Sequence, residues 1–472
     1  MSSDELELMA HLLRRAGFGA SRQELEEYAS KSYEDVVEDL LHPERFPFPI
    51  EDDIARRYFM DLNSFDTSVP QMALWLYRMI HTKRPLEEKI ALFWHYVFAT
   101  SVSKSEHPPS SLTQIDMFRQ NGMVDFRTIL TDLSKDPAMI HWLDNQENHK
   151  GEINENWGRE LLELFSMGVG NYTEDDVQMA SRAFTGWSFT QPIPIYPYSR
   201  YSSEFLYIED DHDDSVKTFL GETGRFNGED IIDIVVKQPA TAKFISRHLY
   251  NFFVADEPPV PVWPEASPQD PHAIETLVET YFDSGGSIRS MLRVMFNSEF
   301  FKKARFKKIK SPIELVAGTV KMCGTYGDPT KFFNQPLMEL YLATRAMGQA
   351  PLHPPTVEGW HTGQEWIDGG SLNERVNFAV DEVSDYTNPG VQAIIKRFST
   401  NGEEVSPQQF VDQSLDLVGP MTVGQETQNA LLEYAESEGN LRFGDETNDQ
   451  KSSARIASML QLIVSSIEYQ FG

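Results

Sequence analysis

The segment from His141 to Trp187 gathers side chains that can transfer protons or bind a polar ligand. It reads HWLDNQENHKGEINENWGRELLELFSMGVGNYTEDDVQMASRAFTGW, an amide- and carboxylate-rich loop followed by two helical stretches. Paired carboxylates suit general acid–base catalysis, because one can donate a proton while another activates water. The catalytic candidates of this segment are Asp144, Glu155, Glu160 and Glu163.

The first helical stretch has one polar and one apolar face. At 100° per residue, its polar side chains share an arc of about 140°. The polar set is Glu155, Asn156, Arg159, Glu160 and Glu163, and the apolar set is Trp157, Leu161, Leu164 and Phe165. Glu155 and Arg159 are four residues apart and can form an ion pair. An ordinary half-exposed helix has the same pattern, so a solvated face remains the alternative to a site.

The loop before this helix supplies further polar groups. Six of them fall within eleven residues: Asp144, Asn145, Asn148, His149, Lys150 and Asn154. Asparagine and aspartate side chains often bond to their own backbone in turns, so some of these groups are structural. If the helix face is covered, the others form a polar pocket. The substrate-binding candidates here are Asn145, Asn148, Lys150, Asn154 and Arg159.

Three aromatic or imidazole side chains outside the polar loop and helix could support such a site. His95 lies in an apolar helix (86–100), where it is either a hydrogen-bonded core residue or a group that orients substrate in catalysis. Trp187 and Trp360 could offer apolar platforms to sugar rings, with the core as the alternative place for both.

A second polar cluster is the acidic run EDDHDD at 209–214, which Lys217 follows. Carboxylates beside a histidine can bind a divalent cation, so His212 and Asp213 are a candidate metal site. No second His or Cys at short spacing supports zinc. The alternative is a solvated acidic loop. His212 and Lys217 are also substrate-binding candidates.

Standard nucleophile and cofactor motifs are missing from the chain. There is no G-x-S-x-G, no G-x-x-x-x-G-K-[ST], no G-x-G-x-x-G after a strand and no H-E-x-x-H. The single cysteine, Cys323, lies in an apolar helix and is expected in the core. The run FKKARFKKIK (301–310) is the one basic cluster, and we interpret it as a solvated face rather than an anion site.

Capped helical segments recur along the chain, while strand-like alternation is scarce. The sequence therefore predicts a mainly α protein, a single large globular helical domain over 1–472 with few short strands. Long irregular loops are expected near 188–216, 256–272 and 352–370. The acidic region 381–450 is expected to be partly irregular.

Charge and hydropathy restrict the partners and the compartment. Acidic residues outnumber basic ones by 72 to 41, giving a net charge of −31. Such a surface repels phosphate backbones and anionic lipid, so nucleic-acid and membrane binding are disfavoured. The partner we expect is a small-molecule or glycan substrate. The N-terminus lacks the basic and apolar regions of a signal peptide, and no run of about 18 apolar residues occurs. We expect a cytoplasmic protein.

Several long motifs resemble those of the bacterial DUF1800 family. They are HLLRRAGFG (11–19), ALFWHYVFATS (91–101), the segment 136–187, HDDSVKTFLGETG (212–224) and PPTVEGWHTGQEWI (354–367). The family is uncharacterised. Its members are often exported and are often encoded beside a second uncharacterised family that resembles sulfatases or phosphatases. This resemblance implies a role in the processing of extracellular polymers. The family pattern falls on Phe93–His95, Leu143–Asn145, Asn154–Asn156, Arg159–Leu161, Gly186-Trp187, His212-Asp213 and Lys217.

Two functional hypotheses follow. The first is a hydrolase-type enzyme acting on a carbohydrate or related polar polymer fragment, with Glu160 or Asp144 as general acid or base and a divalent cation as a secondary option. The second is a non-catalytic helical binding or assembly protein that uses the acidic surface and the 188–216 loop. The enzyme hypothesis expects four side chains around one pocket: His95, Asp144, Glu160 and His212.

Overall fold

The fold is built almost entirely from helices, as the sequence predicts. The computed structural model describes residues 3–47, 69–105, 108–190, 203–327, 336–400 and 404–472. These residues form 23 α-helices and three two-stranded antiparallel sheets. Among them, no helix combines the length and apolar character needed to cross a membrane.

The first half of the chain holds α1 (Ser3–Arg15), α2 (Arg22–Tyr28), α3 (Tyr33–Leu41), α5 (Val69–His81), α6 (Pro85–Val97), α7 (Val102–Ser105), α8 (Pro108–Asn121), α9 (Phe126–Ser134), α10 (Pro137–Trp142), α11 (Asn156–Glu163), α12 (Glu174–Ala183) and α13 (Gly228–Val235). The second half holds α14 (Pro239–Phe253), α15 (Pro271–Asp283), α16 (Ile288–Asn297), α17 (Glu299–Lys302), α18 (Pro312–Cys323), α19 (Pro336–Ala346), α20 (Gly369–Ser384), α21 (Pro389–Thr400), α22 (Pro407–Val418), α23 (Gln425–Ser437) and α24 (Glu446–Ser465). The strands are β1 (Trp187–Phe189), β2 (Phe205–Tyr207), β3 (Lys217–Phe219), β4 (Glu222–Gly224), β5 (Glu404–Val405) and β6 (Leu441–Arg442).

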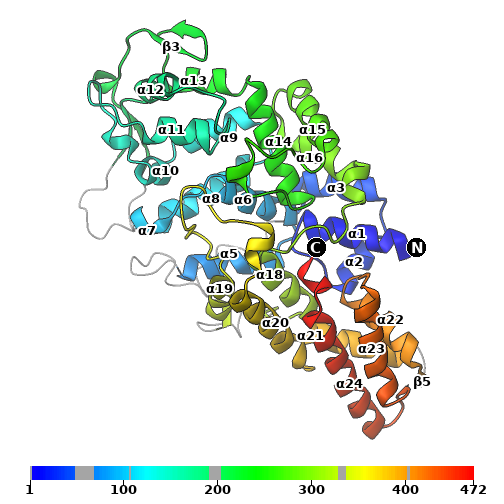
Figure 1. The fold of residues 1–472 in the computed structure, drawn as a ribbon. Helices are drawn as coiled ribbons and strands as arrows, with labels where there is room; N and C mark the ends of the chain where they lie inside the picture. The colour runs from blue at the N-terminus through cyan, green and yellow to red at the C-terminus, as the bar shows by residue number, and fades with distance from the viewer. Residues whose placement is uncertain (1–2, 48–68, 106–107, 191–202, 328–335, 401–403) are drawn as a thin grey trace.

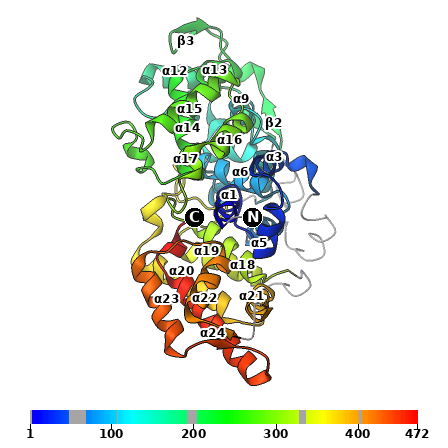
Figure 2. The same cartoon turned by 90° about the vertical axis from the view of Figure 1, so that its right-hand side faces the viewer.

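These helices form an elongated molecule with two ends and a middle. Helices α9–α16 occupy the upper part and α18–α24 the lower part, with α1, α3 and α6 between them (Figure 1). The view turned by 90° shows the same division, with both chain ends near the middle (Figure 2). The two parts therefore meet around α1, α6 and α18.

Helix α6 is the centre of the core, and every residue from Pro85 to Val97 is buried. Its apolar run, Ile90 to Phe98, matches the prediction of a deeply buried helix. Trp94 stacks on Phe98 with ring centroids 4.9 Å apart and donates from Nε1 to the Gly122 carbonyl at 2.9 Å. The indole is thus both packed and hydrogen-bonded, as a buried tryptophan requires.

Local capping signals set several helix starts. Ser21 and Glu24 form a capping box at α2, Thr173 and Asp176 form one at α12, and Ser311 caps α18. In each box the side chains satisfy backbone N–H groups that the first helical turn leaves without partners. The run around Thr173 is therefore a helix start and not a calcium loop.

The regions expected to be irregular contain short ordered stretches. β1 and β2 pair across the 188–216 loop, with Trp187 opposite Tyr207, while residues 191–202 lie outside the described part. Short 3-10 turns occur at Val260–Val262 and Gly363–Trp366 in the other two loops. Most of the acidic region 381–450 is helical. Its acidic residues are interspersed with buried apolar side chains such as Phe398 and Phe410, which give the helices an apolar face to pack.

Candidate active site

Helix α11 carries the polar face that the sequence predicts. Trp157, Leu161 and Leu162 are buried on one side, whereas Arg159, Glu160 and Glu163 remain partly exposed on the other. The buried side packs against α12 (Figure 1). The packing of α11 on α12 therefore fixes the direction in which the two glutamates point.

Gly158 makes this close packing possible. A Cβ atom at Gly158 would lie 2.1 Å from Ser181 Oγ and 2.9 Å from the Ser181 backbone nitrogen. The second contact is with backbone, so a rotamer change alone cannot relieve it.

We expect Gly158→Ala to destabilise the protein by about 1–3 kcal/mol, because overpacking against α12 outweighs the roughly 1 kcal/mol gained in helix propensity. Urea denaturation measures the change. Gly369→Ala is the matched control, since nothing lies within 4 Å of a Cβ atom there. Equal stability of the two variants would mean that α11 and α12 are not packed this closely.

The polar face of α11 borders a cleft of about 610 Å³, whose other wall comes from α14 and the segment around Val260–Val262. This volume is within the range of small-ligand sites. The charged and aromatic residues that line it are Glu160, Glu163, Lys243, Phe244, Arg247, Trp263 and Glu358. The cleft thus combines carboxylates, cations and aromatic rings.

Glu160 is the carboxyl group with the clearest sign of acid chemistry. It makes no hydrogen bond or ion pair within the described part of the chain. Burial, and then the neighbouring charge of Glu163, raise the pKa of Glu160 to about 7. A carboxyl group that holds its proton near neutral pH can donate it to a substrate.

Glu163 lies one turn further along the same helix face. Its Oε2 atom accepts a hydrogen bond from the Tyr172 hydroxyl at 2.9 Å, which holds the carboxylate in place. Residues three apart on a helix are neighbours, so Glu160 and Glu163 can address the same ligand. Both carboxyl groups therefore lie on the wall of the cleft that α11 forms.

The opposite wall supplies a cation and an aromatic surface. Arg247 is 3 % exposed, pairs with Glu257 at 2.8 Å and lies 4.6 Å from the centroid of the Trp263 ring. Its Nη2 atom has no hydrogen-bond partner among the described residues. Arg247 Nη2 is enclosed by the protein and not open to the cleft, whereas Trp263 is only partly buried.

The asparagines of the preceding loop are structural. Asn145 and Asn148 are buried, and their amide nitrogens donate to the carbonyls of Trp187 at 2.9 Å and Ser181 at 2.8 Å. Asn154 donates from its backbone to Asn148 Oδ1 at 3.0 Å. These bonds tie the loop to the end of α12, and none of the three asparagines lines the cleft, so their binding of substrate stays a prediction.

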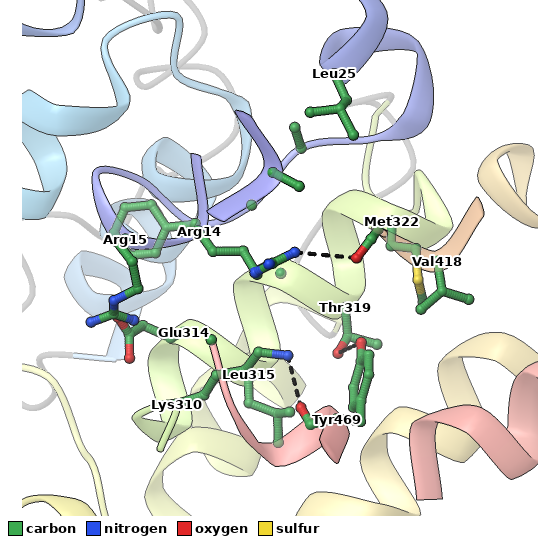
Figure 3. Close-up of a pocket in the computed structure, with 17 residues that line it drawn as sticks. Arg14, Arg15, Leu25, Lys310, Glu314, Leu315, Thr319, Met322, Val418 and Tyr469 are labelled. Atoms are coloured by element: carbon green, nitrogen blue, oxygen red, sulfur yellow. Dashed lines mark hydrogen bonds and ion pairs between the residues drawn. The ribbon is translucent and has the colours of Figure 1, made fainter. Parts of the chain in front are cut away.

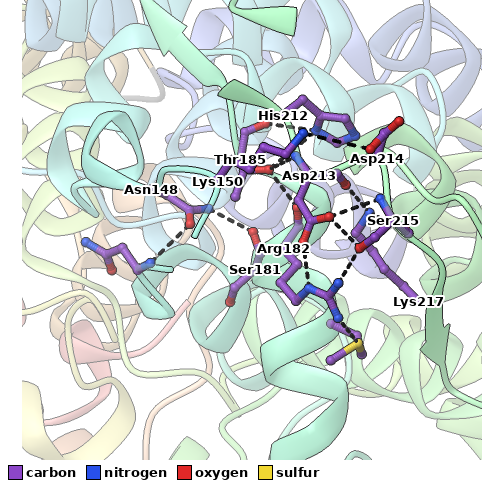
Figure 4. Close-up of polar contacts among 12 residues, drawn as sticks. Asn148, Lys150, Ser181, Arg182, Thr185, His212, Asp213, Asp214, Ser215 and Lys217 are labelled. Atoms are coloured by element: carbon purple, nitrogen blue, oxygen red, sulfur yellow. Dashed lines mark hydrogen bonds and ion pairs between the residues drawn. The ribbon is translucent and has the colours of Figure 1, made fainter. Parts of the chain in front are cut away.

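The side chains around His212 and Asp213 form hydrogen bonds and ion pairs with neighbouring side chains and backbone groups (Figure 4). His212 Nδ1 lies 3.0 Å from the Thr185 carbonyl, and the Asp213 carboxylate accepts from Arg182 Nε at 2.7 Å. Burial acts to raise the pKa of Asp213, but hydrogen bonds from Arg182 and Ser215 outweigh it and hold that pKa below its usual range. The Lys217 ammonium group is 1 % exposed and donates to the Asp213 carbonyl.

This network anchors the 209–217 segment to the end of α12. Within the described ranges, no group of three or more His, Cys, Asp or Glu side chains comes together as a metal site. The candidate cation site at His212 and Asp213 is therefore not supported, because Thr185 and Arg182 already bind these side chains.

His95 and the two candidate tryptophans lie in the core. His95 is fully buried, and its Nε2 atom accepts from the Leu352 backbone N–H at 3.0 Å. Burial, with a smaller effect of His353, lowers the pKa of His95 to about 3. Trp360 packs against His95 with centroids 5.2 Å apart, and Trp187 is 2 % exposed. His95 has no exposed surface for a substrate to contact, whereas Trp360, 4 % exposed, lines a pocket separate from the cleft together with His361 and Trp366.

The remaining candidates lie on the surface away from the cleft. Asp144 pairs with Lys104 at 2.6 Å, and Lys150 lies 3.9 Å from Asp214. Arg159 binds both Glu155, at 3.3 Å, and Glu174, at 2.7 Å. The expected meeting of His95, Asp144, Glu160 and His212 is thus wrong, and of these four only Glu160 lines the cleft.

Sequence reasoning missed the far wall of the cleft. Lys243 and Arg247 are four residues apart on α14 and so share one helix face, which is the one local signal available. Trp263 lies in a proline-rich stretch that reads as a linker. Glu358 precedes the Gly359-Trp360 motif that the sequence analysis examined for its tryptophan alone.

The fold and the cleft together define a mainly helical protein with a carboxylate-bearing pocket. The chain belongs to the DUF1800 family, described as "Protein of unknown function (DUF1800)", whose family model matches residues 11–471. No curated protein and no solved structure matches the chain.

Proposed function

We propose that the protein is a hydrolytic enzyme that cleaves a carbohydrate or a related polar polymer fragment in the cleft between α11 and α14. The observation that carries this proposal is the Glu160 carboxyl group, which faces the cleft without a partner and has a pKa near 7. Glu160 donates its proton to the leaving-group oxygen, and Glu163 activates the attacking water. Trp263, which is only partly buried, provides a stacking surface for a sugar ring.

The pH dependence of hydrolysis tests this assignment. Because the general acid must carry its proton, activity falls by about tenfold per pH unit as the pH rises above about 7, where Glu160 ionises. The assay incubates the full chain with a panel of neutral and acidic oligosaccharides and measures new reducing ends across the pH range. A rate that increases through pH 7 would contradict the acid role of Glu160.

One observation favours the second candidate, a binding or assembly protein. Leu206, Tyr207 and Ile208 are consecutive large apolar residues, and each is 39–40 % exposed beside the 191–202 segment. Exposed apolar clusters are typical of protein–protein contacts. The same panel separates the candidates, since a binding protein releases no reducing ends from any member.

A further inference from the structure

A second, smaller cavity lies where the upper and lower parts of the molecule meet. Its volume is about 60 Å³, and its walls come from α1, the start of α18 and the C-terminal residues (Figure 3). The charged residues that line it are Arg14, Arg15, Lys310 and Glu314. Three cations thus face one side-chain carboxylate, in a chain whose net charge is −31.

The carboxylate of this cavity is already occupied. Glu314 Oε1 pairs with Arg15 at 3.0 Å and with the buried Lys89, while Oε2 accepts from the Ser311 backbone at 2.7 Å. Burial acts to raise the pKa of Glu314, but Arg15 and Lys89 hold it far below its usual range. Glu314 therefore has no capacity left to neutralise further cations.

The Arg14 guanidinium group has more hydrogen-bond donors than acceptors around it. Its Nη1 atom donates to the Gly419 carbonyl at 3.2 Å, and its guanidinium carbon lies 4.8 Å from the centroid of the Phe306 ring. Its Nε and Nη2 atoms are shielded from solvent and have no hydrogen-bond partner among the described residues. Burying a donor without a hydrogen bond costs free energy, particularly when the donor belongs to a charged group.

Lys310 is the second cation without a carboxylate. Its Nζ atom donates to the Tyr469 carbonyl at 2.7 Å and lies 4.1 Å from the centroid of the Tyr469 ring. Neither Lys310 nor Arg14 forms an ion pair within the described ranges. Burial, and then the charge of Arg14, lower the pKa of Lys310. The two side chains extend from different elements toward the same space (Figure 3).

We propose that this cavity is a binding site for a small tetrahedral oxyanion, phosphate or sulfate, held by Arg14 and Lys310. A single water needs roughly 10–15 Å³ of such space, so about 60 Å³ accommodates a group of this size. Arg14, Arg15 and Lys310 are set against the Glu314 carboxylate and the carboxylate of Gly472, which leaves a net charge of +1 that a bound anion offsets. The anion accepts from Nε and Nη2 of Arg14 and so joins α1 to the residues around α18.

Titration of the full chain with inorganic phosphate and, separately, sodium sulfate tests the site. The protein is first freed of both anions, and sodium chloride at equal ionic strength controls for screening. We expect the melting temperature to rise with the logarithm of the oxyanion concentration and not with chloride. A response to both anions, or to phosphate alone, supports the site. A melting temperature that neither anion changes overturns it.

Variants locate the binding. Arg14→Gln should weaken oxyanion binding, measured by calorimetry, by about tenfold or more, because it removes a charge-assisted donor pair. Lys310→Met is the second variant if Arg14→Gln does not fold. Arg225→Gln is the matched control, since Arg225 is 71 % exposed and pairs with Asp214 at 3.5 Å outside the cavity.

Two patterns would overturn the proposal. In one, Arg14→Gln binds the oxyanion as tightly as the unsubstituted chain, or Arg225→Gln loses as much affinity, which indicates adsorption to the surface. In the other, Arg14→Gln lowers the melting temperature equally with and without phosphate, which indicates that Arg14 only supports the fold.

Discussion

Glu160→Gln is expected to reduce turnover by about 10²–10⁴-fold, the usual contribution of a positioned general acid. Glutamine keeps the shape of the side chain but cannot donate a carboxyl proton. Because the Glu160 side chain makes no hydrogen bond or ion pair within the described part of the chain, the substitution removes no such contact. The decrease should therefore appear in kcat, with the melting temperature within a few degrees of the original.

The pH dependence of stability gives an independent check on Glu160. Its pKa is about 7 in the folded protein and is lower in the unfolded chain, so the folded state binds more protons between these values. Ionised Glu160 therefore lowers stability as the pH rises toward 7. The glutamine variant lacks this loss, and its melting temperature at pH 8 should equal or exceed that of the unsubstituted chain.

Glu174→Gln is the matched control for the loss of activity. Glu174 begins α12, is 76 % exposed and pairs with Arg159 outside the cleft, so turnover should stay within about twofold. If Glu160→Gln keeps its activity, or if both variants lose it alike, Glu160 is not the general acid.

The elements of this fold could be predicted from local sequence because their determinants are local. Ser21, Thr173 and Ser311 start helices through contacts three residues away, and the apolar run from Ile90 to Phe98 leaves no exposed face for that helix. Such patterns operate within one or two helical turns. The acidic region 381–450 was harder to predict, because its apolar residues are interspersed among many charges.

Only one wall of the cleft, the one formed by α11, could be predicted from the sequence. The polar face of α11 follows from the helical spacing of its polar residues, which can be read from the sequence. Its partners Arg247 and Trp263 lie more than 80 residues further on, and only tertiary packing brings them to Glu160. No spacing rule connects residues across that distance.

Polar residue types alone also misassigned several core groups. Asn148 and His95 have the chemistry of site residues, but in the fold they satisfy the Ser181 carbonyl and the Leu352 N–H. Buried backbone groups need such partners. A polar side chain that serves a backbone group and one that serves a ligand look alike in a sequence, and only the position of the backbone group separates them.

A buried ion pair between α6 and α8 gives the largest expected effect on stability. Glu88 is fully buried and accepts from Arg119 Nε at 2.8 Å, from Arg119 Nη2 at 2.9 Å and from Trp75 Nε1 at 3.0 Å. Glu88→Gln leaves the Arg119 charge in the core, with the half-exposed Asp116 and the buried Glu87 as its remaining acidic neighbours. We expect a loss of about 3–5 kcal/mol in the free energy of unfolding, measured by urea denaturation.

The loss of stability should come from leaving the Arg119 charge buried without its partner, rather than from losing the attraction between Glu88 and Arg119. A second variant separates these two contributions. Replacing both partners, as Glu88→Leu with Arg119→Met, removes the buried charge and should recover most of the loss. Glu404→Gln is the control, because its pair with Arg442 at 3.4 Å is exposed and worth less than about 1 kcal/mol. If the double variant is less stable than Glu88→Gln, the attraction within the pair, and not the desolvation of one charge, holds α6 against α8.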